Sequence, residues 1–423
     1  MSETQFARLS VQVVTTSEGL AELRPFWEKW NYHPDADYDS YSLVVAARHE
    51  VVSPYVLAVR ENGRLKAILI GRLEKSLVPV TFGYFQLAKL AIRRIVFLHR
   101  GFLGEAELGC ADALIGQLMS DLKRDVADCV LFEHLETSSD LHHLAGCRPN
   151  FFCRDRFVES RVRWKAAVPV SLEKYLNGRS QSQRWQLRRA MRTFENGRAN
   201  RIGYDIFRTR EDAPAFRAAV DRIVSKTYQT GLGVGFKNST EDRRRMELSA
   251  EKGWLKGYTV SLDGEPVAFC SGRLYNGTMY GEWTGYDSAF KELEPGTVVF
   301  LKMVEDLCRS GVREIDFGPG DASYKRRLGD RTVSERPTTI FAPTSRGVVL
   351  NCFMSIEVLT NRLAKYVARK IKFSDAIKRF WRNRKLRALR KATPITKPVE
   401  PSDSEPEVET QRLRSRKTAI FGS

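Results

Sequence analysis

The stretch from Ile315 to Gly329 constrains this chain most, because it reads Ile-Asp-Phe-Gly-Pro-Gly-Asp-Ala-Ser-Tyr-Lys-Arg-Arg-Leu-Gly. The β-prone run Val312–Phe317 leads directly into Gly318-Pro319-Gly320. The two glycines permit backbone conformations that are closed to other residues, which predicts a tight turn. Asp321 follows at a position suited to capping a short helix. The predicted order is strand, tight turn and short helix. It places polar groups beyond the carboxyl end of a strand, where open α/β sheets bind ligands.

Side chains around this turn predict a functional site, although a plain turn between two elements is the alternative. Lys325 is the first candidate for a charge that stabilises an oxyanion or holds an anionic donor. Tyr324 is a candidate acid, and Asp316 is a candidate to orient Lys325 or a substrate amine. The candidate substrate-binding residues at the turn are Gly318, Gly320 and Asp321.

The order of predicted elements recurs along the chain. Asn-Gly at 62–63 and Asp-Gly at 263–264 each predict a hairpin, and each hairpin is followed by strand, loop, helix and strand. Laid side by side without gaps, Ala113–Glu133 aligns with Val298–Gly318. After the second hairpin we expect a strand at Thr278–Thr284, a loop at 285–296, a helix at Val298–Ser310 and a strand at Val312–Phe317. We also expect a helix at Glu18–Trp30, a loop at Tyr32–Tyr41 and a basic helix at Gly178–Asn200.

The run Asp-Phe-Gly-x-Gly-Asp-x-x-Tyr-Lys-x-x-x-Gly resembles the signature of the CelD/BcsL-like acetyltransferases of bacterial polysaccharide and cellulose synthesis, in the wider GNAT (N-acetyltransferase) superfamily. It is similar in layout to the FemABX transferases, which have an aromatic residue where this chain has Leu328. This difference favours the CelD-like branch. The resemblance covers Leu172–Gly329 well and the amino-terminal half in outline.

The repeat and the resemblance together predict an α/β protein of two tandem GNAT-like units, with mixed, mostly antiparallel sheets flanked by helices. We expect a degenerate unit at residues 1–168, which walls the acceptor cleft, and a CelD-like acyltransferase unit at 169–345. A basic amphipathic helical segment at 346–392 and a disordered tail at 393–423 complete the expected organisation.

The resemblance also implies where an acyl-CoA (acetyl-CoA) co-substrate binds. Its pantetheine arm follows the edge of Thr278–Thr284, and its pyrophosphate lies at the amino end of the next helix, where free N–H groups favour anions. The superfamily's Gln/Arg-x-x-Gly-x-Gly/Ala loop is absent there, so an aminoacyl-tRNA donor stays open. The candidate donor-binding residues are Trp283, Tyr286, Gly296 and Thr297.

Two further candidates lie outside the turn. Glu282, next to an aromatic residue on the strand predicted at Thr278–Thr284, is a candidate general base. The alternative is a carboxylate that faces solvent. Arg188, on the basic helix, is a candidate contact for a phosphate or carboxylate of the substrate, with a solvated charged face as the alternative. All six histidines precede residue 144, so the second unit has none of its own, and we expect no metal site.

The net charge of +18 is concentrated near the carboxyl end. Residues 361–391 hold thirteen basic residues and one acid, which gives +12. Apolar residues recur among these charges, which predicts peripheral contact with an anionic membrane and, less favoured, with nucleic acid. The amino terminus has no apolar secretory segment, so we expect a cytoplasmic protein, peripheral at the inner membrane face.

The sequence therefore predicts an acyl-CoA-dependent N- or O-acyltransferase acting on an amino sugar, sugar nucleotide or polysaccharide precursor. Two alternatives stay open: a Fem-like aminoacyl-tRNA-dependent transferase, and a non-catalytic membrane or nucleic-acid adaptor.

Overall fold

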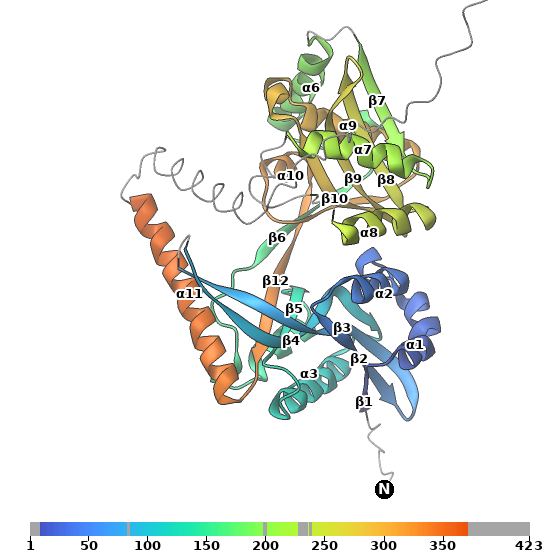
Figure 1. Ribbon diagram of the computed structural model, residues 1–423. Helices are drawn as coiled ribbons and strands as arrows, with labels where there is room; N and C mark the ends of the chain where they lie inside the picture. The colour runs from blue at the N-terminus through green and yellow to red at the C-terminus, as the bar shows by residue number, and fades with distance from the viewer. Residues whose placement is uncertain (1–8, 83–84, 198–200, 227–235, 237–238, 371–423) are drawn as a thin grey trace, which may run out of the picture.

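One sheet of twelve strands runs through the described part of the computed structural model. The structure describes residues 9–370 apart from 83–84, 198–200, 227–235 and 237–238. The strand order is β1-β2-β3-β4-β5-β12-β6-β11-β10-β9-β8-β7. The first half of the chain forms the lower part in Figure 1 and most of the second half forms the upper part.

The two halves repeat the same arrangement of strands. In the first half, four antiparallel strands precede helix α3 (Leu108–Lys123), and the next strand lies parallel to the fourth. In the second half, four antiparallel strands precede α9 (Pro295–Arg309), and the next strand again lies parallel to the fourth. The repeat expected from the sequence is confirmed. The strands are β1 (Leu9–Val14), β2 (Val51–Glu61), β3 (Arg64–Phe82), β4 (Phe85–Gly104) and β5 (Cys129–Glu136), then β7 (Ile202–Phe207), β8 (Leu255–Leu262), β9 (Glu265–Tyr275), β10 (Thr278–Tyr286) and β11 (Glu314–Pro319).

The two central strands are exchanged between the halves. Strand β6 (Arg161–Ala167) precedes the second half in sequence but pairs with β11. Strand β12 (Arg331–Phe341) follows the second half but pairs with β5. The two also pair with each other, which closes the two half-sheets into one (Figure 1). The boundary expected at residue 168 stays a prediction, because the sheet is continuous across it.

Helices cover both faces of each half-sheet. In the second half, Cys270 packs in a core with α9, whereas the neighbouring Phe269 packs with α7 and α8 on the other face. Adjacent strand residues point to opposite faces, so one strand serves both cores. The remaining helices are α1 (Ser17–Trp30), α2 (Tyr38–Ala47), α4 (Asp140–Cys147), α5 (Leu172–Asn177), α6 (Gln181–Glu195), α7 (Asp212–Val224), α8 (Thr240–Glu251), α10 (Ser323–Leu328) and α11 (Ser345–Lys370), with short 3-10 turns η1 (Pro34–Ala36), η2 (Phe151–Cys153) and η4 (Ser288–Leu293).

Three local predictions are wrong. The expected loop over Tyr32–Tyr41 ends in α2, which begins at Tyr38 because the Asp37 carboxylate accepts from backbone N–H groups of its first turn. The expected loop at 285–296 contains the turn η4. Asp321 does not cap α10, whose N-cap is Ala322, because its carboxylate instead accepts from Trp164 Nε1 and pairs with Arg326.

The basic carboxyl-terminal segment is partly described. Helix α11 reaches Lys370, and the predictions for residues 371–423 lie outside the described residues. Exposed apolar side chains recur along α11 at helical spacing, and these are Val349, Phe353, Ile356, Leu359 and Leu363. Among the described residues, no helix combines the length and apolar character needed to cross a bilayer. Membrane contact stays a prediction.

Candidate functional site

Strands β10 and β11 separate after three residue pairs. Their parallel pairing runs from Thr278–Glu314 to Tyr280–Asp316 and then stops. A bulge follows Gly281 on β10, and Gly318 on β11 has φ +73°, a left-handed conformation that favours glycine. Beyond this point β10 still pairs with β9 on its other side. Beyond the third pair, the edge of β10 that faces β11 has no strand partner in the described structure. This is the edge at which the resemblance implies donor binding, which stays a prediction.

Lys325 occupies this opening. It projects from α10, and its Nζ donates to the carbonyl oxygens of Gly318 at 3.1 Å and Pro319 at 2.7 Å. Burial lowers the pKa of the Lys325 amine to about 8; the nearby Arg163 lowers it further, while Asp316 acts in the opposite direction. At neutral pH the amine still carries its charge in most molecules, so the opening holds a buried cation.

Asp316 has a different partner from the one expected. Its Oδ1 lies 2.8 Å from Arg163 Nη1 and also accepts from the backbone N–H of Gly318 at 2.8 Å. Arg163 also contacts Glu335, at 2.8 Å. Asp316 therefore belongs to a buried ion network that joins β6, β11 and β12. The role expected for Asp316, to orient Lys325 or a substrate amine, stays a prediction.

A cavity of about 720 Å³ lies on one side of the opening, at the amino end of α9. Gly296 packs tightly there, since a Cβ at this position would lie 3.3 Å from the Tyr286 ring. Arg327 donates to Thr297 Oγ1 at 3.1 Å and to Glu294 at 3.2 Å, which adds a cation beside the helix end. The structure thus brings four expected residues to one cavity, and these are Trp283, Tyr286, Gly296 and Thr297.

Two further cavities adjoin the cavity at α9. A second cavity of about 290 Å³ shares Glu282, Trp283 and Lys325 with the cavity at α9. A third, of about 220 Å³, shares Gly281, Glu282 and Gly318 with the second. The three cavities adjoin one another at these shared residues, from the α9 end to the junction between the two halves of the chain, and we call them together the passage. Tyr324 lines the first two cavities and stacks on Phe300, with ring centroids 5.0 Å apart.

Glu282 faces the passage but is held by two arginines. Its Oε1 lies 2.7 Å from Arg273 Nε and 3.0 Å from Arg245 Nη2. These two ion pairs fix the position of the carboxylate. The interpretation of Glu282 as a general base stays a prediction. The same carboxylate also holds the guanidinium groups of Arg273 and Arg245 in place.

Three predicted substrate-binding residues lie apart from the passage. Arg188 pairs with Glu173 on the surface of the second half, with its side chain 47% exposed. Asp321 is similarly exposed and bonds to Trp164. Gly320 has φ +100° and completes the turn without lining the cavities described above. Their expected role stays a prediction.

Residues of the first half reach the passage, and the sequence interpretation missed them. His33 lines the third cavity, where its ring lies 4.4 Å from that of Tyr280. Asp35 bonds to Arg273 and lies 3.5 Å from Arg245. Both residues lie in the aromatic, acidic segment around η1. The aromatic and acidic composition of this segment was the one sign that it could belong to a site. Nothing local in the segment predicts its contact with strands that come much later in the chain.

The strand opening and the helix that begins beside it lie in a segment that is similar to a known domain family. Residues 181–326 match the family described as an acetyltransferase (GNAT) domain, a range that holds β10, α9, β11 and most of α10. A search of curated proteins finds no significant match.

Solved structures match this chain at low identity. FemX is 13% identical, with 78% of this chain and 97% of that chain covered, at a TM-score of 0.49. L-PGS from Bacillus licheniformis is 14% identical, with 81% and 97% covered, at 0.47. A tandem GNAT protein from the clavulanic acid biosynthesis pathway is 12% identical, with 80% and 100% covered, at 0.46.

Proposed function

We propose that this chain is an acyl-CoA-dependent N- or O-acyltransferase. The observation that carries the proposal is the passage between β10 and β11, with a cavity at the start of α9 on one side and polar cavities on the other. A two-substrate transfer needs the donor and acceptor to meet from separate directions. Lys325 lines the second cavity, which lies between the cavity at α9 and the third cavity.

The donor-side cavity fits an acyl-CoA. The free edge of β10 offers backbone groups to an extended arm that contains amides. The amino end of α9, with Arg327 and Lys291 lining the cavity, favours the pyrophosphate. A larger side chain at Gly296 would press on the ring of Tyr286, which also lines the cavity. The bound donor supplies a thioester, whose carbonyl would accept the acceptor's nucleophile.

The residues of this chain then have separate tasks in the proposal. The Lys325 ammonium, held by two carbonyl oxygens, stabilises negative charge that develops on the reacting carbonyl oxygen. Tyr324 is the proposed acid for the leaving thiolate. The acceptor loses a proton to Glu282, the proposed base, as its new bond to the acyl carbon forms. The thiolate gains a proton from Tyr324 as the carbon–sulfur bond breaks.

We further propose the CelD/BcsL-like branch, with an amino sugar, sugar nucleotide or polysaccharide precursor as acceptor. Its support is the run from Asp316 to Gly329 with Leu328 in place of the Fem-type aromatic. Leu328 is buried in the core of the second half, so its identity is constrained by packing as well as by the site.

The test is calorimetric titration of acetyl-CoA and desulfo-CoA into the full chain. We expect micromolar binding, weakened about tenfold or more by Gly296→Val, since the new side chain would meet Tyr286. Gly116→Val is the matched control, because a Cβ there meets nothing. Absence of binding at millimolar ligand would overturn the acyl-CoA proposal and favour aminoacyl-tRNA transfer or an adaptor.

A further inference from the structure

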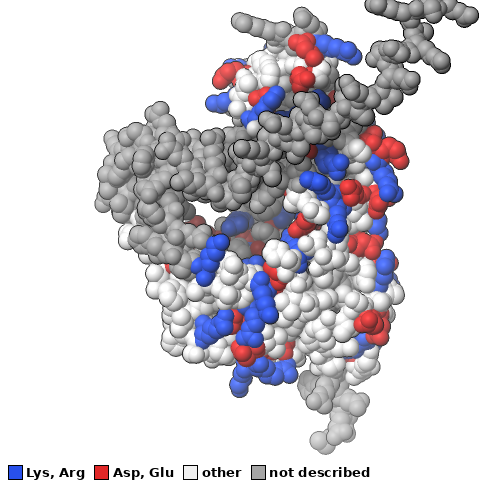
Figure 2. All heavy atoms as spheres, viewed as in Figure 1, with Lys and Arg blue, Asp and Glu red and all other residues white. Residues whose placement is uncertain are grey.

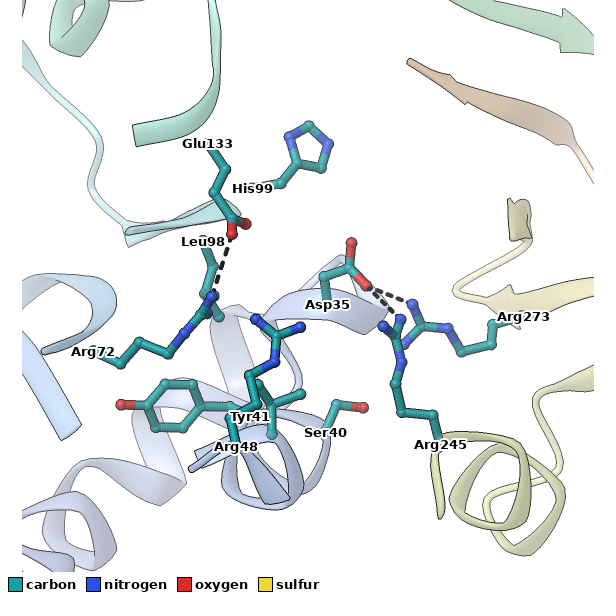
Figure 3. Close-up of a pocket in the computed structure, with 11 residues that line it drawn as sticks. Asp35, Ser40, Tyr41, Arg48, Arg72, Leu98, His99, Glu133, Arg245 and Arg273 are labelled. Atoms are coloured by element: carbon teal, nitrogen blue, oxygen red, sulfur yellow. Dashed lines mark hydrogen bonds and ion pairs between the residues drawn. The ribbon is translucent and has the colours of Figure 1, made fainter. Parts of the chain in front are cut away.

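A fourth cavity, of about 140 Å³, continues the passage on the acceptor side, and four arginines converge on it (Figure 3). It shares Asp35, Arg245 and Arg273 with the third cavity. We call it the arginine chamber, defined by Arg48, Arg72, Arg245 and Arg273 together with Asp35, Glu133 and His99. It lies at the junction of the two halves, where Figure 2 shows basic and acidic side chains interspersed.

The chamber forms where the first half repeats the strand opening of the second. The parallel pairing of β4 with β5 ends at Phe97 and Phe132, and the residues that follow, Leu98, His99 and Glu133, line the chamber. In the ungapped alignment of the two halves, Glu133 corresponds to Gly318. The first half therefore uses its own strand opening to build a polar cavity that faces the opening of the second.

The four arginines come from both halves and are held in place. Arg48 follows α2 and bonds to Glu241 of α8 through two N–H groups, at 2.9 and 2.8 Å. Arg72 on β3 bonds to the buried Glu74 at 2.6 Å. Glu241 and Glu74 hold these arginines without lining the chamber.

Arg273 and Arg245 are fixed in the same way by Glu282, which lines the third cavity and not the chamber. Guanidinium groups that are already ordered lose little freedom when an anion binds.

Arginines outnumber carboxylates among the residues that line the chamber. Four arginines line it with Asp35 and Glu133, whereas Glu74, Glu241 and Glu282, which pair with the arginines, lie outside the lining. The excess of arginine therefore belongs to the wall of the chamber and not to the whole ion network. Burial lowers the pKa of His99 well below its usual value, so this ring adds no charge at neutral pH. Arginine forks match carboxylate and phosphate groups in geometry. The two lining carboxylates can accept bonds from hydroxyl or ammonium groups of the same ligand.

We propose that the arginine chamber is the acceptor subsite and binds the carboxylate or phosphate group of a small anionic acceptor. The acceptor's amine or hydroxyl then lies toward the opening, along the cavity that Arg245 and Arg273 also line. This inference rests on the proposed transferase function. It adds that the acceptor is anionic and that the first half of the chain selects it.

The experiment measures binding of matched probes to the full chain by calorimetry, without donor. The pairs are glucosamine 6-phosphate with glucosamine, and glucuronate with glucose, and inorganic phosphate is titrated separately. We expect at least one anionic probe to bind about tenfold or more tightly than its neutral partner, because bonds to charged groups are the stronger ones. Arg245→Gln should remove this preference.

The matched control is Arg244→Gln, which makes the same charge change at the neighbouring, exposed position of α8 and should keep the preference. Where Arg245→Gln does not fold, Arg48→Gln tests the same chamber from the first half. Equal binding of anionic and neutral probes would overturn the proposal, as would equal losses in the two neighbouring variants. Inorganic phosphate binding as tightly as glucosamine 6-phosphate would indicate a free-ion site and overturn the acceptor assignment.

Acetyl-CoA titration alongside separates the two proposals. Donor binding without any anionic preference would leave the transferase function standing and remove the chamber's assignment. Anion binding that depends on Arg245 without acetyl-CoA binding would remove the acyl-CoA proposal and retain an anion site.

Discussion

Lys325 Nζ donates to the carbonyl oxygen of Gly318, the residue whose left-handed backbone turns the chain at the end of β11. The cation at the centre of the passage is thus fixed by the turn that creates the opening. Because it is buried, its charge is sensitive to pH in a range where exposed lysines are not.

Replacing Lys325 with Ala should lower turnover about a hundredfold or more while acetyl-CoA still binds, because the charge is needed as the oxyanion forms. Arg326→Ala, one position further along α10 and exposed, is the control and should keep activity. Near-wild-type turnover of Lys325→Ala in a folded protein would contradict this role.

The pH dependence follows from the lowered pKa of Lys325. The protonated amine is the active form, so turnover should fall as pH rises through about 8. Lys325→Arg, if active, should lose this alkaline limb, because a guanidinium stays charged. The measurement is kcat against pH from 6 to 10 with saturating substrates. A flat profile through pH 9 would count against a required charge at this position.

Gly318 should be costly to replace. With φ +73°, any residue with a Cβ is strained there, and Gly318→Ala should cost about 1–2 kcal/mol of the free energy of unfolding. Urea denaturation of the full chain measures this. Gly116→Ala in α3, where a new Cβ meets nothing, should be neutral or stabilising. A similar stability of both variants would remove the argument from backbone strain.

Local chemistry made the turn and the repeat predictable. Two glycines around Pro319 predicted the change of direction after β11, and the ungapped alignment that relates α3 to α9 also relates β5 to β11. These two inferences depend on residues close in sequence or on a repeated pattern, which a single sequence contains. The donor-side residues were instead implied by the resemblance to the GNAT superfamily.

The exchanged strands and the arginine chamber were not predictable in this way. Strand β6 pairs with β11, which lies far from it in sequence, and its own residues carry no mark of this partner. Arg72 and Arg273 read as ordinary strand residues until the sheet brings both to one cavity. Asp321 shows the same limit on a smaller scale, since Trp164 from β6 competes for the carboxylate that local pattern assigned to a helix cap.

Arg163 should be critical for stability. It lies between Asp316 and Glu335, and all three side chains are buried. Arg163→Met would leave both carboxylates without their cation, which costs about 3–5 kcal/mol where a buried pair is broken. Arg148→Met removes an arginine from an exposed pair with Asp112 and should cost less than about 1 kcal/mol. Comparable midpoints in urea would refute the difference.

His33 should act as a hydrogen-bond donor and not as a base. Burial lowers its pKa to about 3, and its Nδ1 accepts from the backbone N–H of Asp35, so the proton lies on Nε2. That nitrogen has no partner among the described residues. His33→Gln retains an N–H group and should keep acceptor binding, whereas His33→Phe should raise the acceptor KM with a smaller change in kcat. A kinetic pKa near 6.5 that disappears in His33→Gln would instead indicate a base.

The exposed apolar face of α11 should contact anionic membranes together with the basic sequence that continues it. Phe353 and Ile356 are 47% and 57% exposed, and residues 361–391 carry +12. Vesicles of phosphatidylglycerol should bind the full chain, neutral phosphatidylcholine should bind it much less, and added salt should weaken the contact. Phe353→Ser with Ile356→Ser should reduce sedimentation with vesicles. Leu108→Ser with Val170→Ser, which removes two exposed apolar side chains elsewhere, is the control. Equal binding to neutral vesicles, or equal losses in the two double variants, would show that this face is not the membrane contact.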